Sequence, residues 1–363
     1  MRKFEFVPLF TRTKNTSQKY NLSMENKHYF LSANTNEGFC NYFDFATSPA
    51  RDGYVYILKG GSGTGKSTLM KTVGEFFGGM GESIEYFHCS SDPESLDGVL
   101  LKERNVAIVD GTSPHVREAN IPGADSKIIN LGESISDNLR TKRKEIEKLY
   151  KKKKQSYSYI EQILEVVGKL YEINAKIEKN SQKNSDMDKL FNKFVEKPCG
   201  DKLEKEGCVR HLFRTVLSDD GEKNFDKDNA YKKVLKARLG ICDATELFLR
   251  LSEIFEERGN EVICFHDYLS PKNIESLYLV EQGVLIERTS AKLSLGNCPN
   301  LELYVNNEFM IDGLLAFTAK FLAVARGHHF EIEKIYRGYV DFSKHKTITS
   351  EIISDIKTNF PID

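Results

Sequence analysis

The sequence predicts an α/β protein made of two copies of one unit, with a helical segment inserted between them. Three observations support this fold class. In the first half, a strand rich in β-branched and aromatic residues leads through a glycine-rich turn into an apolar-periodic helix. The second half repeats this succession, and the stretch between the two halves carries apolar residues in heptads.

Length and composition set the outer limits. The chain has 363 residues, enough for two domains or for one large domain with an insertion. Its formal net charge of -1 provides no field that would favour nucleic acid or an acidic membrane. Glu5 and Pro8 interrupt the apolar stretch at the basic N-terminus, which makes a poor signal peptide. The apolar run at 313–325 contains Lys320 and is too short to span a bilayer, so we expect a core helix there and a cytoplasmic protein.

The 7 cysteines include no C-x-x-C pair. Cys208 and His211 have C-x-x-H spacing with Cys199 upstream, which is weak evidence for zinc because a paired fourth ligand is missing. We therefore expect reduced thiols, as in most cytoplasmic proteins.

The most specific motif is "YVYILKGGSGTGKSTLMKTVGEFF", which contains G-x-x-x-x-G-K-S between a strand and a helix. Its glycines let successive N–H groups point at phosphate oxygens, and the helix adds a positive dipole end. Lys66 is expected to contact the β- and γ-phosphates, and the Ser67 hydroxyl to bind Mg²⁺. The residues expected to hold the nucleotide are Gly60, Gly61, Ser62, Gly63, Thr64, Gly65, Lys66, Ser67 and Thr68.

Three further elements follow this motif. "SIEYFHCSS" predicts a second strand, "PESLDGVLLK" a short helix that begins at Pro93, and "NVAIVDG" a third, buried strand that ends in Asp110. An acid at the carboxyl end of such a strand is the usual place for the carboxylate that holds Mg²⁺ through water. We expect Asp110 to act in this way.

The group that would activate water is harder to assign. Many P-loop ATPases carry a Glu directly after this Asp, but Gly111 stands there. His115 is the catalytic candidate, since it can orient water or contact the γ-phosphate, although a loop His is often simply solvated. His88 either senses nucleotide or is a satisfied buried His. Further candidates are the acids Asp92, which can also cap the predicted helix, Glu94 and Asp97.

The internal repeat is long and ungapped. The segment from Leu69 to Thr112 aligns with the segment 178 residues further on, which places Phe77 on Phe255 and Pro93 on Pro271. "HYFLS" at 28 resembles "HLFRT" at 211, and "EIEKLY" at 145 resembles "EIEKIY" at 331, so the repeat extends outward in both directions.

The second copy lacks the chemistry of the first. Ala244 replaces Lys66, Asp243 replaces Gly65 and Arg288 replaces Asp110. Thr245 alone cannot bind a triphosphate, and a desolvated Asp would repel it. "ATELFLRLSEIF" keeps the apolar face of the helix, so we expect a folded second copy that serves as scaffold, regulator or binding platform.

The inserted segment has the heptad pattern of a coiled coil, which breaks at Lys153 and Ser156. The break, "KKKKQSYS", fits either the turn of an α-hairpin or an exposed stretch of helix. Its Lys and Tyr side chains form either a solvated face or, less in keeping with the flanking Glu residues, a nucleic-acid contact. The predicted seam comprises Ile160, Ile163, Val167, Leu170, Asn174 and Ile177.

Together these patterns predict two P-loop NTPase-like three-layer domains with a helical, coiled-coil-like insertion. The expected divisions are an N-terminal extension (1–27), an active P-loop domain (28–131), a helical hairpin or coiled coil (132–198), and a degenerate P-loop-like domain with C-terminal helices (199–363).

Most of the chain resembles a family of tandem P-loop proteins from Firmicutes described as ATPases or nucleotide-kinase-like proteins. The resemblance rests on "HYFLSANTNEGF", "ILKGGSGTGKSTLMK", "FHCSSDPESLDGV", "VAIVDGTSPH" and "PGADSKIINLGE" in the first half. "RHLF", "VLKAR" and "MIDGLLAFTAKFLAVARGHHFEIEKIY" carry it in the second half. It implies two P-loop domains and ATP binding without naming a substrate, and this chain departs from it at Asp243 and Ala244.

Three functions fit the sequence. The first is a Mg²⁺-dependent ATPase in which ATP drives a conformational change; the absence of an N-K-x-D motif favours ATP over GTP. The second is a kinase for a small molecule or nucleotide held near His88, Asp92 and Asp97, with Arg140 and Arg143 as a lid. The third is a nucleotide-gated binding module with negligible turnover. Partners are a small-molecule acceptor, or a protein bound by the insertion or the second domain, and the oligomeric state stays open.

Overall fold

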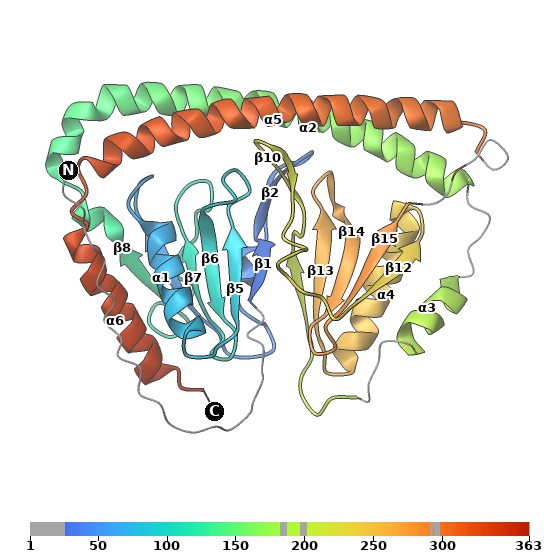
Figure 1. The fold of residues 1–363 in the computed structure, drawn as a ribbon, viewed down its shortest axis with the longest axis horizontal. Helices are drawn as coiled ribbons and strands as arrows, with labels where there is room; N and C mark the ends of the chain where they lie inside the picture. The colour runs from blue at the N-terminus through green and yellow to red at the C-terminus, as the bar shows by residue number, and fades with distance from the viewer. Residues whose placement is uncertain (1–25, 182–186, 197–201, 291–292, 294–297, 363) are drawn as a thin grey trace, which may run out of the picture.

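The computed structural model describes residues 26–181, 187–196, 202–290, 293 and 298–362, and shows a mixed α/β fold. Two β-sheets stand next to each other, and two long helices run above both of them (Figure 1). The mixed α/β class predicted from the sequence is confirmed. None of the described helices combines the length and apolarity that crossing a bilayer requires.

The first sheet has the strand order β1-β5-β6-β7-β4-β8. β6 is antiparallel to both neighbours, and the other pairs are parallel. The strands are β1 (Lys27–Phe30), β4 (Tyr54–Lys59), β5 (Ile84–His88), β6 (Leu96–Leu101), β7 (Val106–Asp110) and β8 (Ser126–Asn130). The three predicted strands are confirmed as β4, β5 and β7, but the short helix predicted from Pro93 is wrong. "LDGVLL" is instead the fully buried strand β6, since a short apolar run by itself does not separate strand from helix.

The second sheet repeats this arrangement. Its order is β12-β15-β14-β13-β9, so that, counted from β9, it matches β1-β5-β6-β7-β4 in order and strand direction. Its strands are β9 (Cys208–Leu212), β12 (Lys233–Arg238), β13 (Glu261–Asp267), β14 (Ser270–Leu279) and β15 (Val284–Thr289). Each half also carries a small hairpin, β2 (Ser32–Thr35) with β3 (Gly38–Asn41), and β10 (Val216–Ser218) with β11 (Gly221–Lys223).

The helices that cover the sheets are exchanged between the halves. α1 (Lys66–Gly78) packs on the first sheet together with α6 (Ser343–Asn359), which lies at the end of the chain. α4 (Ile241–Glu257) packs on the second sheet together with α3 (Met187–Glu196), which precedes that sheet in sequence. The predicted division into 132–198 and 199–363 is therefore wrong in space, because α3 belongs to the core of the second sheet and α6 to that of the first. Short 3₁₀ turns are η1 (Phe43–Phe45), η2 (Leu131–Ser134) and η3 (Asp137–Lys142).

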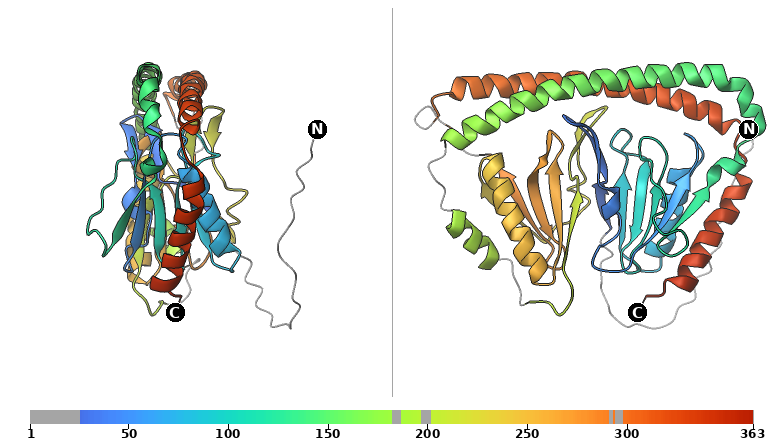
Figure 2. Two further views of the ribbon diagram at one scale, coloured as in Figure 1. Left: turned by 90° about the vertical axis from the view of Figure 1, so that its left-hand side faces the viewer. Right: turned by 180° about the vertical axis from the view of Figure 1, so that it is seen from behind.

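α2 (Arg143–Ser181) and α5 (Leu301–Arg337) form an antiparallel pair over both sheets (Figures 1 and 2). Lys153 meets His329 near one end, with 3.0 Å between Nζ and Nδ1, and Asn307 Nδ2 donates to Asn174 Oδ1 at 2.9 Å near the other. α2 is one continuous helix, so the α-hairpin alternative is wrong. The stretch is helical but only partly exposed, because Ser156 in it is buried. "EIEKLY" and "EIEKIY" lie at the same end of the pair, at the start of α2 and near the end of α5, and so do not occupy equivalent positions.

The coiled-coil seam agrees in part with the heptads. Ile160, Val167, Asn174 and Ile177 are buried as predicted, whereas Leu164 is buried instead of Ile163. The apolar run at 313–325 lies in α5 and buries only one face, so it is not a core helix on all sides. In the run from 151 to 154, Lys153 is half-buried and the other three Lys are exposed.

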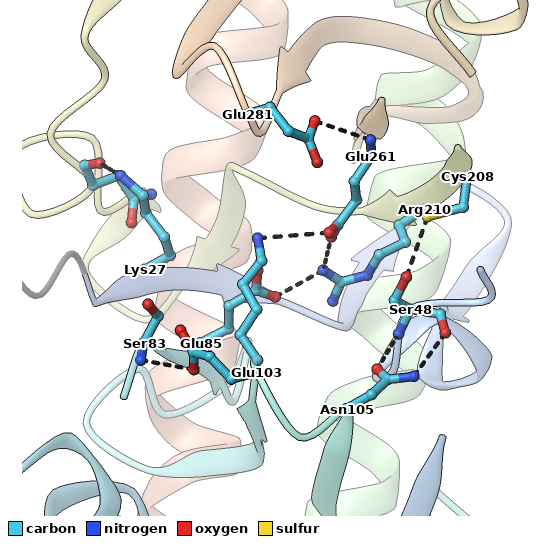
Figure 3. A network of polar contacts seen from close by, with 12 residues as sticks. Lys27, Ser48, Ser83, Glu85, Glu103, Asn105, Cys208, Arg210, Glu261 and Glu281 are labelled. Atoms are coloured by element: carbon cyan, nitrogen blue, oxygen red, sulfur yellow. Dashed lines mark hydrogen bonds and ion pairs between the residues drawn. The ribbon is translucent and has the colours of Figure 1, made fainter. Parts of the chain in front are cut away.

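The faces of the sheets that point away from α1 and α4 meet in one shared hydrophobic core. The rings of Tyr29 and Phe265 lie 5.2 Å apart across it. Arg210 of β9 is fully buried, and its Nη1 lies 2.9 Å from a carboxylate oxygen of Glu85 in β5 and of Glu261 in β13, which ties the sheets together (Figure 3). Among the described residues no α-helix covers these faces. The prediction of two separate three-layer domains is therefore wrong, because each sheet has helices on one face and the other sheet packed against its second face.

Two matching His pairs lie where the halves meet. His28 Nδ1 is 2.9 Å from His88 Nε2, and His211 Nδ1 is 2.8 Å from His266 Nε2. Backbone hydrogen bonds between Phe30 and Phe213 join β1 and β9 beside these pairs. This arrangement supports the predicted correspondence of "HYFLS" and "HLFRT". Burial lowers the pKa of His88 and of His266 to about 4.

The lowered pKa values predict an acid-sensitive fold. Since the folded-state pKa lies below the ordinary value of 6.5, unfolding takes up protons as the pH falls below 6.5, and the free energy of unfolding decreases from there toward pH 4. The variant His266→Gln should lose up to about 3 kcal/mol of this pH dependence. Urea denaturation of both proteins across this range measures the difference, and parallel curves would contradict the role of His266.

Candidate functional site

The glycine-rich loop lies between β4 and α1, under the end of α5. Gly63 and Gly65 have φ values of 73° and 83°, a left-handed region that side chains with a Cβ rarely enter. Thr64 Oγ1 donates to the Gly61 carbonyl at 2.8 Å, which closes the turn. The loop therefore holds the compact shape that its glycines predict.

Lys66 and Asp110 meet at the carboxyl end of the sheet. The Lys66 amine donates to the carbonyls of Gly60 and Gly61 at 3.0 Å each, and lies 3.6 Å from Asp110 Oδ2. Both side chains are largely buried. The parallel pairing of β4 with β7 produces this contact, because it places Leu58 beside Asp110. Asp110 Oδ1 accepts from the N–H and hydroxyl of Thr112, which fixes the carboxylate.

Ser67 is oriented by the strand next to it. Its Oγ accepts the Leu96 N–H at 3.0 Å, and a hydroxyl oxygen has a second lone pair for another partner. Thr68, the next residue of α1, is exposed. All nine residues predicted to hold a nucleotide thus lie on this loop and on the first turn of α1.

His115 is buried, not solvated. Its Nε2 lies 3.4 Å from Asp97 Oδ2, and its ring packs between Phe39 and Phe43 with centroids 5.1 Å from each. Burial raises the pKa of Asp97, and the neighbouring His115 counteracts this effect. Cys89 joins the two, since its Sγ lies within 4.8 Å of their ligand atoms.

The other acids near the loop point elsewhere. Asp92 pairs with Arg326 of α5, which also binds Asp219 at 2.8 Å. Glu94 is exposed, and its carbonyl accepts from Lys71. Asp92 also accepts the Ser95 hydroxyl, but no helix begins there for it to cap.

The residues of the kinase hypothesis do not converge. His88 faces His28, while Asp92 and Asp97 each bind a different partner. Arg140 and Arg143 lie on the surface, where they pair with Asp137 and Glu147 of the same stretch of chain. Arg326 of α5, which the kinase hypothesis did not include, reaches the loop after β5 through its ion pair with Asp92.

The end of α5 and the start of α6 cover the glycine-rich loop. A Cβ on Gly61 would lie 2.3 Å from the Tyr336 ring, and one on Gly65 would lie 3.0 Å from His345 Nδ1. A Cβ on Gly63 would lie 2.9 Å from the backbone carbonyl oxygen of Glu333. Sequence reasoning missed these contacts because "EIEKIY", which contains Glu333 and Tyr336, was interpreted as a repeat. The crowding shows that Gly61 is needed for the approach of a helix as well as for the turn.

The equivalent loop in the second half no longer has the shape of a phosphate-binding loop. α4 begins at Ile241, so the residues aligned with the end of the glycine-rich loop are helical. Ala244 is fully buried, and Asp243 lies in the first turn of the helix. One feature persists: Thr245 Oγ1 accepts the Ile274 N–H at 3.1 Å, as Ser67 does with Leu96. The second half has the corresponding helix and strands without the loop shape and without the lysine.

A protein carboxylate caps the start of α4. Glu178 of α2 accepts the Ile241 N–H at 3.2 Å and the Tyr304 hydroxyl at 3.0 Å. Arg288, at the position of Asp110, lies 3.7 Å from the same carboxylate. Because a helix N-terminus attracts anions, Glu178 provides in the protein itself the negative charge that a bound phosphate would bring. In the first half the strand-end residue is the acid Asp110 and its partner is the cation Lys66. In the second half the strand-end residue is the cation Arg288 and its partner is the acid Glu178.

The weak zinc prediction receives no geometric support among the described residues. The Cys208 Sγ lies 3.3 Å from Ser48 Oγ, and His211 is paired with His266. Cys199 lies outside the described residues.

Comparison of the chain with models of protein families, with curated proteins and with solved structures gave no match.

Glu178 should be essential to the stability of the second half. Glu178→Ala removes one of the buried carboxylates beside Arg288 and leaves the start of α4 uncapped, so the free energy of unfolding should fall by about 3 kcal/mol. The matched control is Glu165→Ala on the same helix, whose side chain is exposed and pairs only with Lys169. Urea denaturation of the two variants tests this, and equal losses would show that Glu178 has no special role.

Proposed function

We propose that the first half of the chain binds Mg·ATP and hydrolyses it, and that the second half is a nucleotide-free copy of the same P-loop unit. One observation carries the proposal. The Lys66 amine lies inside the glycine-rich loop, against the carbonyls of Gly60 and Gly61, and 3.6 Å from the strand-end carboxylate of Asp110. A lysine, a strand-end acid and a helix N-terminus placed together in this way suit a metal-bound triphosphate.

The residues present fit magnesium as well as nucleotide. Ser67 Oγ retains a lone pair, and Asp110 Oδ2 faces the Lys66 amine, so both offer oxygen ligands of the kind that Mg²⁺ prefers. When bound, Mg²⁺ would neutralise charge on the β- and γ-phosphates. Ser67 would bind it directly, and Asp110 through water.

Each residue then has a physical task. The backbone N–H groups from Gly61 to Ser67 bind phosphate oxygens, and Lys66 exchanges its loop carbonyls for the β- and γ-phosphates. We assign the task of polarising the attacking water to His115 and Asp97, which lie 3.4 Å apart. The charges of Lys66 and Asp110 both act on the Asp97 carboxyl, so the pair is close to the proposed phosphate site.

α5 offers a route by which nucleotide binding affects the rest of the molecule. It begins over the second sheet, where Tyr304 binds Glu178, and ends on the loop, where Tyr336 contacts Gly61. A loop that closes on phosphate must move relative to Tyr336 and Glu333, and a helix transmits this displacement along its axis. The resemblance to tandem P-loop proteins of Firmicutes supports the same function.

Lys66→Ala should lower the affinity for ATP by at least about 10–100-fold, because it removes the charged partner of the phosphates. The fold should be unchanged, as Lys66 lies at the end of a helix that is anchored by its apolar face. The matched control is Lys71→Ala on the same helix, whose amine reaches only the Glu94 carbonyl. Calorimetric titration with ATP and Mg²⁺ measures both variants. Ordinary affinity in Lys66→Ala would contradict the site.

Turnover separates the ATPase from its alternatives. Free phosphate released from ATP and Mg²⁺ alone, and lost in Lys66→Ala, is the expected result. ADP formed without free phosphate, and only with one added metabolite or nucleoside, would replace the proposal with a kinase. Binding without turnover in any mixture would replace it with a nucleotide-gated module.

A further inference from the structure

Three side chains that bind transition metals in many proteins converge beside the glycine-rich loop. Cys89 follows β5, Asp97 lies in β6, and His115 lies in the loop after β7. Sγ, a carboxylate oxygen and an imidazole nitrogen of these residues lie within 4.8 Å of one another. In the part of the chain that the structure describes, this is the one such group of three.

Asp97 and His115 are buried, Cys89 is half-buried, and the cluster is incompletely satisfied. His115 is 9% exposed and Asp97 4%. His115 Nδ1 and Asp97 Oδ2 both lack a hydrogen-bond partner. Leaving a buried polar atom without a partner costs about 1–3 kcal/mol, so these atoms call for a ligand. The ring of His115 is fixed between Phe39 and Phe43, which holds its nitrogens in place without using them.

The second half carries a different set of charged groups at the same position. By the offset of the repeat, Cys89 corresponds to Asp267, Asp97 to Glu275 and Asp110 to Arg288. There the guanidinium of Arg288 faces both acids. In the first half the residue at the position of Arg288 is itself an acid, and Lys66 is its ion-pair partner. The first half thus lacks the guanidinium, and the cation that acts on Asp97 and Asp110 is the Lys66 amine.

We propose that Cys89, Asp97 and His115 bind one divalent transition-metal ion of the zinc class. A thiolate, an imidazole and a carboxylate are the ligand types of such sites, and ligand atoms on one zinc ion lie roughly 3–4 Å apart, so the three groups need to close by only about 1 Å. Three protein ligands leave a fourth tetrahedral position open, as in catalytic rather than structural zinc sites. Binding replaces the thiol proton of Cys89, which is released to solvent.

This site is distinct from the proposed magnesium site. Mg²⁺ selects oxygen ligands and does not bind thiolate, whereas Ser67 and Asp110 offer no sulfur or nitrogen. The inference also gives His115 a role as ligand, in place of the role in orienting water. Metal binding can be measured without nucleotide. Its failure would leave the proposed nucleotide site at Lys66 and Asp110 untouched, whereas its success would require another group to orient the attacking water.

The test uses the full chain, stripped with a chelator and titrated with Co²⁺, which reports thiolate ligation by a charge-transfer band and tetrahedral geometry by its visible bands. We expect one Co²⁺ per chain, displaced by Zn²⁺. Cys89→Ser should remove the charge-transfer band, and Asp97→Asn and His115→Ala should each weaken binding at least about 10-fold while the band remains.

Two control variants decide where the metal sits. Cys242→Ser changes an exposed thiol and should leave the titration unaltered. Lys66→Ala should keep one Co²⁺ per chain, since Lys66 is not a ligand. The absence of stoichiometric binding in the unmodified chain, a charge-transfer band that persists in Cys89→Ser, or loss of the metal in Lys66→Ala would each overturn the proposal.

Discussion

The antiparallel pairing of α2 and α5 is the interaction on which the rest of the structure depends. Each helix starts over one sheet and ends over the other, and so carries the helix that follows it to the opposite half. Without this pairing α3 and α6 would have no sheet to cover, and the residues of the two sheets and of α1 and α4 that pack against them would lose that cover. Because the sheets also share one core, the two halves form a single cooperative body in which each completes the other.

This exchange places the candidate site under the control of both halves. The glycine-rich loop is encoded in the first half, but Glu333, Tyr336 and His345, which cover it, come from the end of the chain. At the opposite end of the helix pair, Glu178 of α2 covers the start of α4. The glycine-rich loop lies under the end of α5, and the start of α4 lies under the end of α2, so the two places correspond. They differ in the group at their centre, which is a lysine in the first and a carboxylate in the second. One presents Lys66, whose amine is held by the loop carbonyls, and the other is closed by Glu178 and Arg288. The proposed nucleotide site and its closed counterpart thus share one framework.

The sequence predicted the local chemistry better than the assembly. The motif from Gly60 to Ser67 and the strand that ends in Asp110 were located from residue types alone, since a glycine loop and a buried strand depend on local preferences. The β6 strand was mistaken for a helix because a six-residue buried run has no distinguishing period. The exchange of α3 and α6 and the pairing of α2 with α5 could not be predicted, because heptads show that a helix has a partner and not which one. Cys89 has no signal of its own in the sequence, and its proximity to Asp97 and His115 follows only from the fold.

The most direct test of the central claim, one working nucleotide site in a chain built from two similar halves, is the stoichiometry of nucleotide binding. Native mass spectrometry of the full chain with a non-hydrolysable ATP analogue and Mg²⁺ counts the molecules bound. The account predicts one nucleotide per chain at saturation, because Glu178 and Arg288 already fill the second position. Two nucleotides per chain would contradict it, as would one nucleotide that remains bound at unchanged affinity when Lys66 is replaced.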